Sequence, residues 1–240
     1  CLVILTTNIS VFSQTDQSSK GWTTTFDGFG IFSSPRVTDL NEDGVGDIVI
    51  GVGRTEFHAC DSAVIALDGA NGKMLWKVPS IDHIFTSASL MDITEDHIPE
   101  IFIGGRSAQL MAINGRTGEV IWKFDRSQGG IKWFNFYNPQ FIPDQDADGT
   151  KDILISNGGN VMILPKITEG RYPGNLVVVS GKTGKLLARA SMPDGKETYM
   201  SVAAIPTNDG NDYKVIFGSG GETIGGHLYA TTLSEIMKGD

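Results

Sequence analysis

A short acidic loop occurs three times in this chain, each time between two segments with the short apolar pattern of a β-strand. The loops begin at Asp39, Asp92 and Asp144, so their first residues lie 53 and 52 positions apart. A period near 50 residues indicates a repeat architecture, in which units that cannot bury their apolar faces alone stack against one another. No other feature of the sequence constrains the fold as strongly.

Each loop carries oxygen-bearing side chains at its positions 1, 3, 5 and 9. Hard divalent cations such as calcium prefer oxygen ligands, and a tight loop with this spacing can direct several of them toward one point. The sequence therefore predicts bound Ca²⁺, with sites in the first and third loops and a weaker or absent site in the second. The alternative is that the loops are solvated acidic turns without a metal ion.

The formal net charge is −9, from 28 acidic and 19 basic residues, and much of the acidic excess stands in these loops. An acidic surface repels phosphate groups, so neither nucleic acid nor an anionic membrane is expected as a main partner. Crowded carboxylates also repel one another unless cations neutralise them, which favours the metal interpretation. The two cysteines, Cys1 and Cys60, are too few for a disulfide framework.

Each unit contains four predicted strands: one before the acidic loop, one directly after it, and two joined by a glycine-containing hairpin. Trp76 and Trp122 occupy the same place in the fourth strand of the first two units, where the third unit has Ala188. We expect these tryptophans to pack against the next unit. A fourth unit is degenerate, and its turn over 207–212 lacks the ligand spacing. The units span residues 33–80, 86–126, 138–192 and 200–233.

Four antiparallel strands per unit predict an all-β fold, a β-propeller with about three complete blades and one partial blade. A solenoid is the main alternative, but its period is usually shorter. Residues 22–26 resemble a fourth strand with no unit before it, as in a blade built from both chain ends. We expect residues 15–240 to form one propeller domain, part of a larger ring of ~7–8 blades, or alternatively a complete four-bladed ring.

Residues 1–14 are apolar and are followed abruptly by polar residues, which is the pattern at the end of a secretory signal peptide. A first β-strand is one alternative, and a lipidated Cys1 is another, although no polar tether follows this cysteine. No later segment reaches the roughly 18 apolar residues that a membrane-spanning helix needs. The sequence therefore predicts a secreted, periplasmic or cell-surface protein without a transmembrane segment.

The acidic loops, together with the apolar strand after each of them, resemble the FG-GAP or VCBS repeats of integrin α-subunit-like propellers. The glycine hairpin and its tryptophan, as in residues 66–76, resemble the tryptophan-docking motif of the pyrroloquinoline-quinone (PQQ)-like propeller repeat. The two motifs alternate across residues 22–232. The resemblance is specific for the fold and not for the function, because function depends on sites grafted on folds.

In the FG-GAP-like family the loop holds calcium through side chains at positions 1, 3, 5 and 9 and a backbone carbonyl at position 7. The resemblance implies that Gly44 and Gly149 provide the unusual backbone angles of the turn. The second loop departs from the pattern, since Thr94 replaces an acid or amide and His97 replaces the glycine. The implied ligands are Asp39, Asn41, Asp43, the Val45 carbonyl and Asp47 in the first loop; Asp92, Thr94, Asp96, the Ile98 carbonyl and Glu100 in the second; and Asp144, Asp146, Asp148, the Thr150 carbonyl and Asp152 in the third.

These features favour a secreted calcium-binding propeller that acts as a protein- or glycan-interaction scaffold, with calcium in a structural role. The resemblance also allows two enzymes, a calcium-dependent rhamnogalacturonan-type polysaccharide lyase and a fragment of a quinoprotein. A lyase needs a base and basic residues that converge on one groove with a metal ion. No catalytic residue is predicted, because the histidines are scattered outside any catalytic motif: His58, His83, His97 and His227.

The non-repeated segment 131–139 contains four aromatic residues, Trp133, Phe134, Phe136 and Tyr137. If exposed, these side chains form a surface that could stack on sugars or dock a protein. If buried, the segment is an approach strand with large core residues. We expect burial for about half of them and a ligand surface from the rest.

Overall fold

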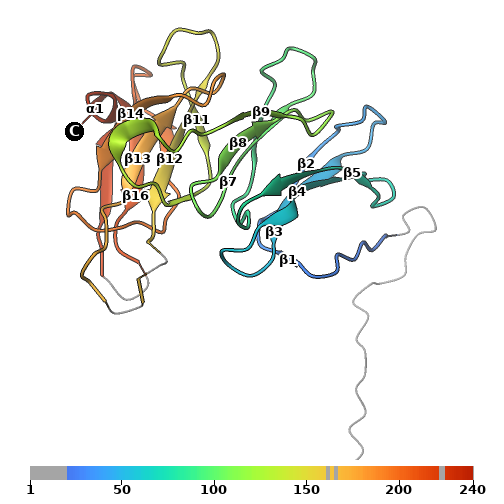
Figure 1. The fold of residues 1–240 in the computed structure, drawn as a ribbon. Coiled ribbons are helices and arrows are strands. Elements are labelled where there is room, and N and C mark those ends of the chain that lie inside the picture. The colour runs from blue at the N-terminus through green and yellow to red at the C-terminus, as the bar shows by residue number, and fades with distance from the viewer. Residues whose placement is uncertain (1–20, 161–162, 165–166, 222–224, 240) are drawn as a thin grey trace, which may run out of the picture.

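The computed structural model describes residues 21–239 except 161–162, 165–166 and 222–224, and it consists almost entirely of antiparallel β-sheet. Four sheets follow one another along the chain, and neighbouring sheets stack face to face as propeller blades do (Figure 1). The predicted all-β propeller fold is therefore confirmed. The predicted signal peptide, residues 1–14, lies outside the described residues.

The four sheets match the four predicted units. The first contains β1 (Gly30–Ile31), β2 (Arg36–Thr38), β3 (Asp47–Gly53), β4 (Cys60–Leu67) and β5 (Met74–Ser80). The second contains β6 (Ser89–Met91), β7 (Glu100–Gly104), β8 (Leu110–Ile113) and β9 (Val120–Lys123). The third contains β10 (Asn135–Phe136), β11 (Gln140–Ile142), β12 (Asp152–Gly158), β13 (Asn175–Val179) and β14 (Leu186–Ser191). The fourth contains β15 (Ala203–Pro206), β16 (Tyr213–Gly218) and β17 (Leu228–Thr232).

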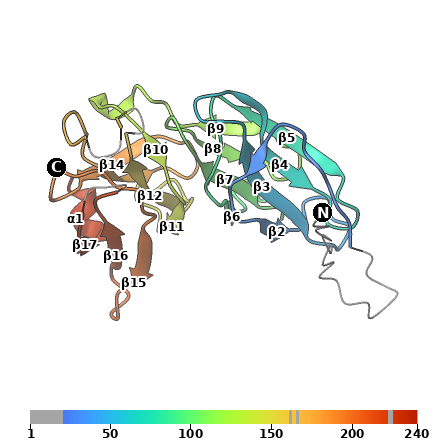
Figure 2. The same cartoon turned by 90° about the horizontal axis from the view of Figure 1, so that it is seen from below.

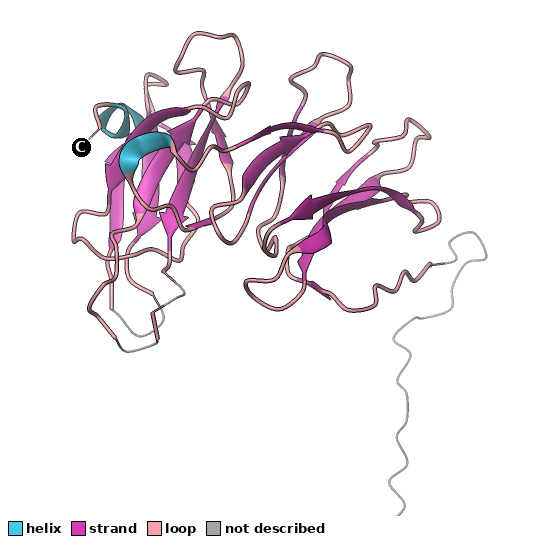
Figure 3. Cartoon of the chain, in the orientation of Figure 1, coloured by secondary structure: helices cyan, strands magenta, loops and turns pink. Residues whose placement is uncertain are grey.

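Among the described residues, helices are confined to two short segments, the 3-10 helix η1 (Gln128–Gly130) and the helix α1 (Leu233–Met237) (Figure 3). The central strands are near-continuous apolar runs because neighbouring blades cover both of their faces. All five residues of β7 are buried, for example. The hydrophobic core accordingly lies between blades: Val64 packs in one cluster with Ile103, and Phe102 in the next cluster with Ile155.

Each tryptophan of the repeat docks on the glycine hairpin of the following blade. The indole N–H groups of Trp22, Trp76 and Trp122 donate to the carbonyls of Gly69 (2.8 Å), Gly115 (2.7 Å) and Gly181 (2.9 Å). Each ring also covers a second hairpin glycine with positive φ, where an added Cβ would lie 2.3–2.7 Å from the indole: Gly72, Gly118 and Gly184. These glycines therefore serve both the turn and the close approach of the tryptophan.

Two expectations about the first residues of the repeat are wrong. Residues 22–26 form no strand, because no strand pairs with their backbone in the part of the chain that the structure describes. Trp22 nevertheless docks as its counterparts do. The first and fourth sheets lie at opposite ends of an open arc (Figures 1 and 2), so a four-bladed ring closed by residues 22–26 is not formed.

Candidate functional site

The three acidic loops share one backbone conformation, with positive φ at positions 4 and 6. The φ angles are 61°, 61° and 62° at Glu42, Glu95 and Ala147, and 82°, 70° and 86° at Gly44, His97 and Gly149. His97 therefore adopts the left-handed conformation that glycine adopts in the other two loops, although a side chain disfavours it. The second loop differs from the others in its ligand side chains and not in its backbone.

The last acid of each loop is fully buried and ties the loop to the hairpin of the same blade. Asp47 accepts hydrogen bonds from the backbone N–H groups of Leu40 (2.8 Å) and Gly69 (2.9 Å). Asp152 makes the same two contacts in the third loop, at 2.7 Å and 3.1 Å. Because Gly69 also accepts the hydrogen bond of Trp22, one glycine links the acidic loop to the tryptophan dock.

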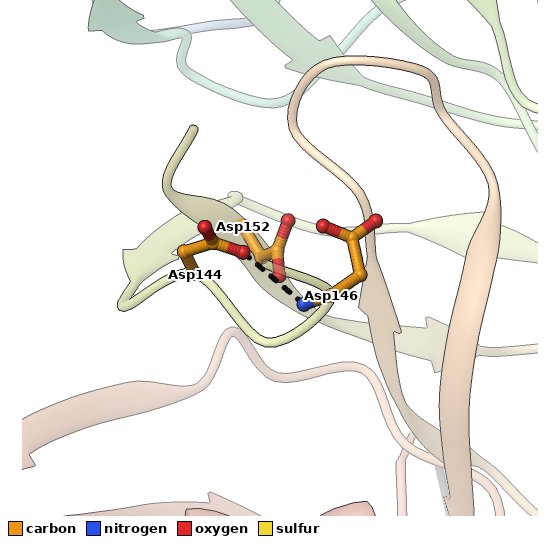
Figure 4. A group of neighbouring side chains, drawn as sticks. All are labelled: Asp144, Asp146 and Asp152. Carbon is orange, nitrogen blue, oxygen red and sulfur yellow. Dashed lines mark hydrogen bonds between the residues drawn. The ribbon is translucent and has the colours of Figure 1, made fainter. Parts of the chain in front are cut away.

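The third loop gathers three carboxylates, and their oxygens lie within 4.8 Å of one another: Asp144, Asp146 and Asp152 (Figure 4). Burial raises the pKa of Asp152 to about 6, and the charges of Asp146 and Asp144 act in the same direction. Backbone hydrogen bonds lower the pKa of Asp144, and the largest contribution comes from the N–H group of Gly149. Such a cluster of mutually repelling oxygens fits a calcium ion, which prefers carboxylate ligands.

The first loop offers an oxygen without a donor. Asp39 Oδ1 is buried and has no hydrogen-bond partner among the described residues, whereas Oδ2 accepts from the N–H of Gly44 (2.9 Å). The exposed Asn41 and Asp43 accept only hydrogen bonds from within the loop: Asn41 from the N–H of Asp43 (3.0 Å), and Asp43 from the N–H of Val45 (2.8 Å) and the amide of Asn41 (3.4 Å). A buried carboxylate oxygen with a free lone pair is an available cation ligand, so this donor set also fits calcium.

In the second loop the candidate ligands are already engaged. The hydroxyl of Thr94 donates to Glu100 Oε1 at 3.0 Å, and burial raises the pKa of Glu100. Arg116, in the hairpin of the same blade, lies 3.7 Å from Asp96. A guanidinium thus supplies positive charge where a metal ion would, and this loop fits calcium less well than the other two.

Hairpin cations were not predicted as part of the site. Arg116 also pairs with Glu42 of the first loop at 2.8 Å, and Lys182 donates to the backbone carbonyl of Asp148 at 3.1 Å. Both cations directly follow the docking glycine, at a position where the first hairpin has Ala70. That shared position is the sequence signal that could have identified them.

The Asp148 carboxylate and the predicted carbonyl ligands fit the calcium interpretation less directly. The carboxylate of Asp148 accepts from the N–H of Thr150 (2.8 Å) and the hydroxyl of Ser180 (3.3 Å), so it is partly turned to the hairpin. Among the residues whose carbonyls are expected as ligands, Val45 is exposed and Ile98 is buried. Asp148 is therefore the third-loop acid that a calcium ion would have to reorient.

The aromatic segment is mainly core. Trp133, Phe136 and Tyr137 are buried and Phe134 is half-buried. The rings of Trp133 and Phe136 stack with centroids 6.0 Å apart, and the indole N–H donates to the carbonyl of Gln128 at 2.8 Å. Burial leaves Phe136 in the core, whereas Trp133 and Phe134 line a shallow depression and Tyr137 lines a cavity that the sequence did not predict.

The sequence profile of the FAM234A/B beta-propeller family matches residues 22–238. Protein FAM234A of Bos taurus is 28% identical over 134 residues, which cover 49% of this chain and 24% of that protein. Protein FAM234A of Mus musculus is 27% identical over 158 residues, which cover 58% of this chain and 28% of that protein. The chain thus spans about a quarter of the length of the curated relatives it matches.

Solved propellers share the fold at low sequence identity. BamB from Moraxella catarrhalis has a TM-score of 0.50 and 14% identity, with 87% of this chain and 47% of that chain covered. The PilY1 C-terminal domain from Pseudomonas aeruginosa has a TM-score of 0.53 and 18% identity, with 82% and 47% covered. Quinohemoprotein alcohol dehydrogenase ADHIIG from Pseudomonas putida HK5 has a TM-score of 0.52 and 16% identity, with 82% and 30% covered. At these identities the likeness concerns the fold alone.

Proposed function

Because this chain belongs to the FAM234A/B β-propeller family, we propose that it is an extracytoplasmic interaction module whose blades are stabilised by calcium. The loops would act as FG-GAP-type calcium sites, and the partner would be a protein or a glycan. The convergence of Asp144, Asp146 and Asp152 within 4.8 Å is the observation that carries the calcium assignment. The donor-free oxygen of Asp39 supports a second site in the first loop.

Calcium, when bound, would supply charge neutralisation at the blade turns. In the third loop Asp152 connects the candidate site to the N–H of Gly181, whose carbonyl accepts the hydrogen bond of Trp122 from the preceding blade. A cation that holds this carboxylate ionised would also hold the hairpin in the position that the tryptophan needs. Calcium would thereby strengthen the contact between neighbouring blades.

An extracytoplasmic location suits such sites, because calcium there is abundant enough to occupy loops with a Kd on the order of 10⁻⁴ to 10⁻³ M. The location rests on the sequence of residues 1–14 and on this chemistry. Within the described residues, no helix is both long enough and apolar enough to cross a membrane. We assign residues 15–240 to one propeller domain.

A polysaccharide lyase is less well supported. A histidine, an arginine and a tyrosine do converge on one cavity, which is lined by His83, Arg106 and Tyr137. The cavity lies at the opposite end of the strands from the acidic loops, and the seven residues of β3 alone span roughly 20 Å. A metal ion in the loops is therefore too distant to assist a base in this cavity.

Calcium-dependent thermal unfolding of the whole chain tests the proposal. Asp146 is exposed and accepts only one long hydrogen bond, so Asp146→Ala should leave the calcium-free protein nearly unchanged. At tenfold excess over Kd, each occupied site contributes about 1.4 kcal/mol, which corresponds to roughly 3–6 °C in Tm. We expect the calcium-dependent rise to fall by about half in the variant, since only the first loop still binds.

Asp61→Ala is the matched control, because Asp61 is an exposed acid of β4 away from the loops, with two long ion pairs of 3.6 and 3.8 Å. It should retain the full calcium-dependent rise. An equal rise in Asp146→Ala and the wild type would rule out the third loop as a site. No rise in any variant would reduce all three loops to acidic turns.

A further inference from the structure

A cavity of about 480 Å³ lies at the end of the strands opposite to the acidic loops, and residues from the first three blades and from the connections between blades line it. Its walls include Glu56, His83, Phe85, Arg106, Tyr137 and Tyr199. These residues stand in the connections between blades and in the turns after β3 and β7, and none belongs to the repeat. The volume is in the range of small-molecule sites, which are concave and carry a few convergent polar groups.

A short chain of polar contacts crosses this cavity. Arg106 Nε donates to His83 Nε2 at 3.0 Å, and Arg106 Nη2 donates to Glu56 Oε1 at 2.6 Å. Burial, and next the charge of Arg106, lower the pKa of His83, so its ring is neutral near pH 7. Because Nε2 accepts a hydrogen bond, the single proton of the neutral ring is on Nδ1.

Two donors among these polar contacts have no acceptor. His83 Nδ1 and Arg106 Nη1 are both buried without a hydrogen-bond partner among the described residues. His83 is only 5% exposed, and the Arg106 side chain 14%. The Arg54 carbonyl interacts with the His83 ring and is the smallest influence that raises its pKa, although no acceptor meets the geometry of a hydrogen bond to Nδ1. Buried donors without an acceptor destabilise a protein, so their position in a cavity points to a ligand that accepts from them.

The cavity walls are held in place by strained turns. Asp82 accepts from the N–H of Phe57 (3.0 Å) and the hydroxyl of Ser107 (2.7 Å), and thereby joins two turns from different blades. Phe57 and Ser107 directly follow Glu56 and Arg106, and their φ angles are 62° and 53°. Positive φ in such residues is uncommon, and strain of this kind gathers at functional sites.

The charge balance and the aromatic walls select the ligand class. Glu56 already neutralises Arg106, and the chain carries a net charge of −9, so an anionic ligand is disfavoured. A hydroxyl group can accept from Arg106 or His83 and at the same time donate to Glu56. Phe85 stands edge-on to Tyr137 at 5.6 Å and adds apolar wall for the carbon–hydrogen face of a ring.

We propose that this cavity binds a neutral saccharide, whose hydroxyl groups accept hydrogen bonds from Arg106 and His83 and donate to Glu56. The proposal rests on the interaction role given above and names a glycan as the partner. It does not rest on the calcium sites, which lie at the other end of the strands.

Saturation-transfer difference NMR on the whole chain tests this inference, with D-glucose, D-galactose and D-mannose as probes and D-glucuronate as the anionic comparison. We expect at least one neutral sugar to bind, and more tightly than glucuronate. Arg106→Gln should weaken it about tenfold or more, because it removes the charged donor. Phe85→Ala tests the apolar wall without touching the polar chain, and the Tm of each variant confirms folding.

Arg126→Gln is the matched control, since Arg126 is exposed, lies outside this cavity and lines a neighbouring depression. It should bind the sugar as the wild type does, and a loss of binding in this variant alone would move the site to that depression and overturn the assignment. Absence of binding for all three neutral sugars, or tighter binding of glucuronate, overturns the proposal. Because the two sites lie at opposite ends of the strands, sugar binding should persist in EDTA. The two proposals can therefore fail separately: a calcium-dependent rise in Tm without sugar binding supports the calcium role and refutes this one.

Discussion

The two ends of the strands are built differently. At one end the same three parts recur from blade to blade: a buried carboxylate such as Asp152, a docking glycine such as Gly181, and a tryptophan such as Trp122. At the other end the turns differ in every blade, and unlike side chains such as His83 and Arg106 meet once. A recurring arrangement serves a need that blades share, which is attachment to the neighbour, whereas an arrangement that occurs once can select a ligand.

The largest effect should come from removing a tryptophan dock. Trp76 is buried and its indole donates to Gly115 at 2.7 Å, so Trp76→Ala should lower the free energy of unfolding by about 3–5 kcal/mol. Trp76→Phe keeps most of the apolar contact and loses only the donor, so it should cost about 1–2 kcal/mol. Urea unfolding measures both.

The same variants also test whether the two ends of the strands act independently. If the docked end only holds blades together, Trp76→Phe should leave the affinity of the cavity for its sugar unchanged. A loss below about 1 kcal/mol for Trp76→Ala would show that the dock is not a main source of stability.

The next largest effect should come from removing the buried carboxylate that ties the acidic loop to the hairpin. Asp152→Ala leaves the buried N–H groups of Gln145 and Gly181 without an acceptor, so we expect a loss of about 2–4 kcal/mol in EDTA. Asp146→Ala, at the exposed side of the same loop, should change the calcium-free stability by at most about 0.5 kcal/mol. Equal losses in the two variants would contradict a structural role for Asp152 apart from metal binding.

The sequence predicted the repeated end well and the other end not at all. The strands after the acidic loops follow from apolar runs such as that of β7, and the tryptophan dock follows from its fixed place in the unit. His83, by contrast, is read from sequence as an ordinary loop residue. Its partners Arg106 and Glu56 come from other turns and share no spacing with it, so only the stacking of blades brings them together.

The strand expected at 22–26 shows a related limit. Local pattern identifies the tryptophan at its beginning, but a strand also needs a neighbour that the local pattern cannot supply. For the same reason the aromatic segment was ambiguous. Phe124 packs edge-on against both Trp133 and Phe136, at 5.1 and 5.0 Å, and this contact with a different blade decides their burial.

The third largest effect should be the change of calcium affinity with pH. Burial raises the pKa of Asp152 to about 6, so below that pH calcium must displace a proton from this carboxyl group. Between pH 7 and pH 5 the affinity of the third loop should fall roughly tenfold. Isothermal titration calorimetry measures this in an Asp43→Ala background, which confines binding to the third loop.

Without calcium, protonation of Asp152 has the opposite effect: it stabilises the folded protein. A carboxyl group whose folded-state pKa is raised from 3.8 to about 6 contributes stability that is present below pH 3.8 and is lost as the pH rises through 6. Calcium should restore stability in this window, and a pH-independent calcium affinity would show that Asp152 is not a ligand.

The smallest effect concerns the backbone of the second loop. His97 has a φ of 70°, where its two counterparts are glycines, so His97→Gly should raise the free energy of unfolding by about 0.5–1 kcal/mol. Gly44→Ala is the reverse control, since an added Cβ there meets nothing within 4 Å and its cost reports backbone strain alone. A destabilised His97→Gly would instead reveal a favourable contact of the imidazole.

The same variant decides why the second loop departs from the other two. His97→Gly restores the glycine of the pattern, but Thr94 remains bonded to Glu100 and Arg116 remains beside Asp96. If the ligand set limits calcium binding, the variant should be more stable and still bind no additional calcium by calorimetry. A new calcium site would show that backbone strain, and not the hairpin cation, limits calcium binding in this loop.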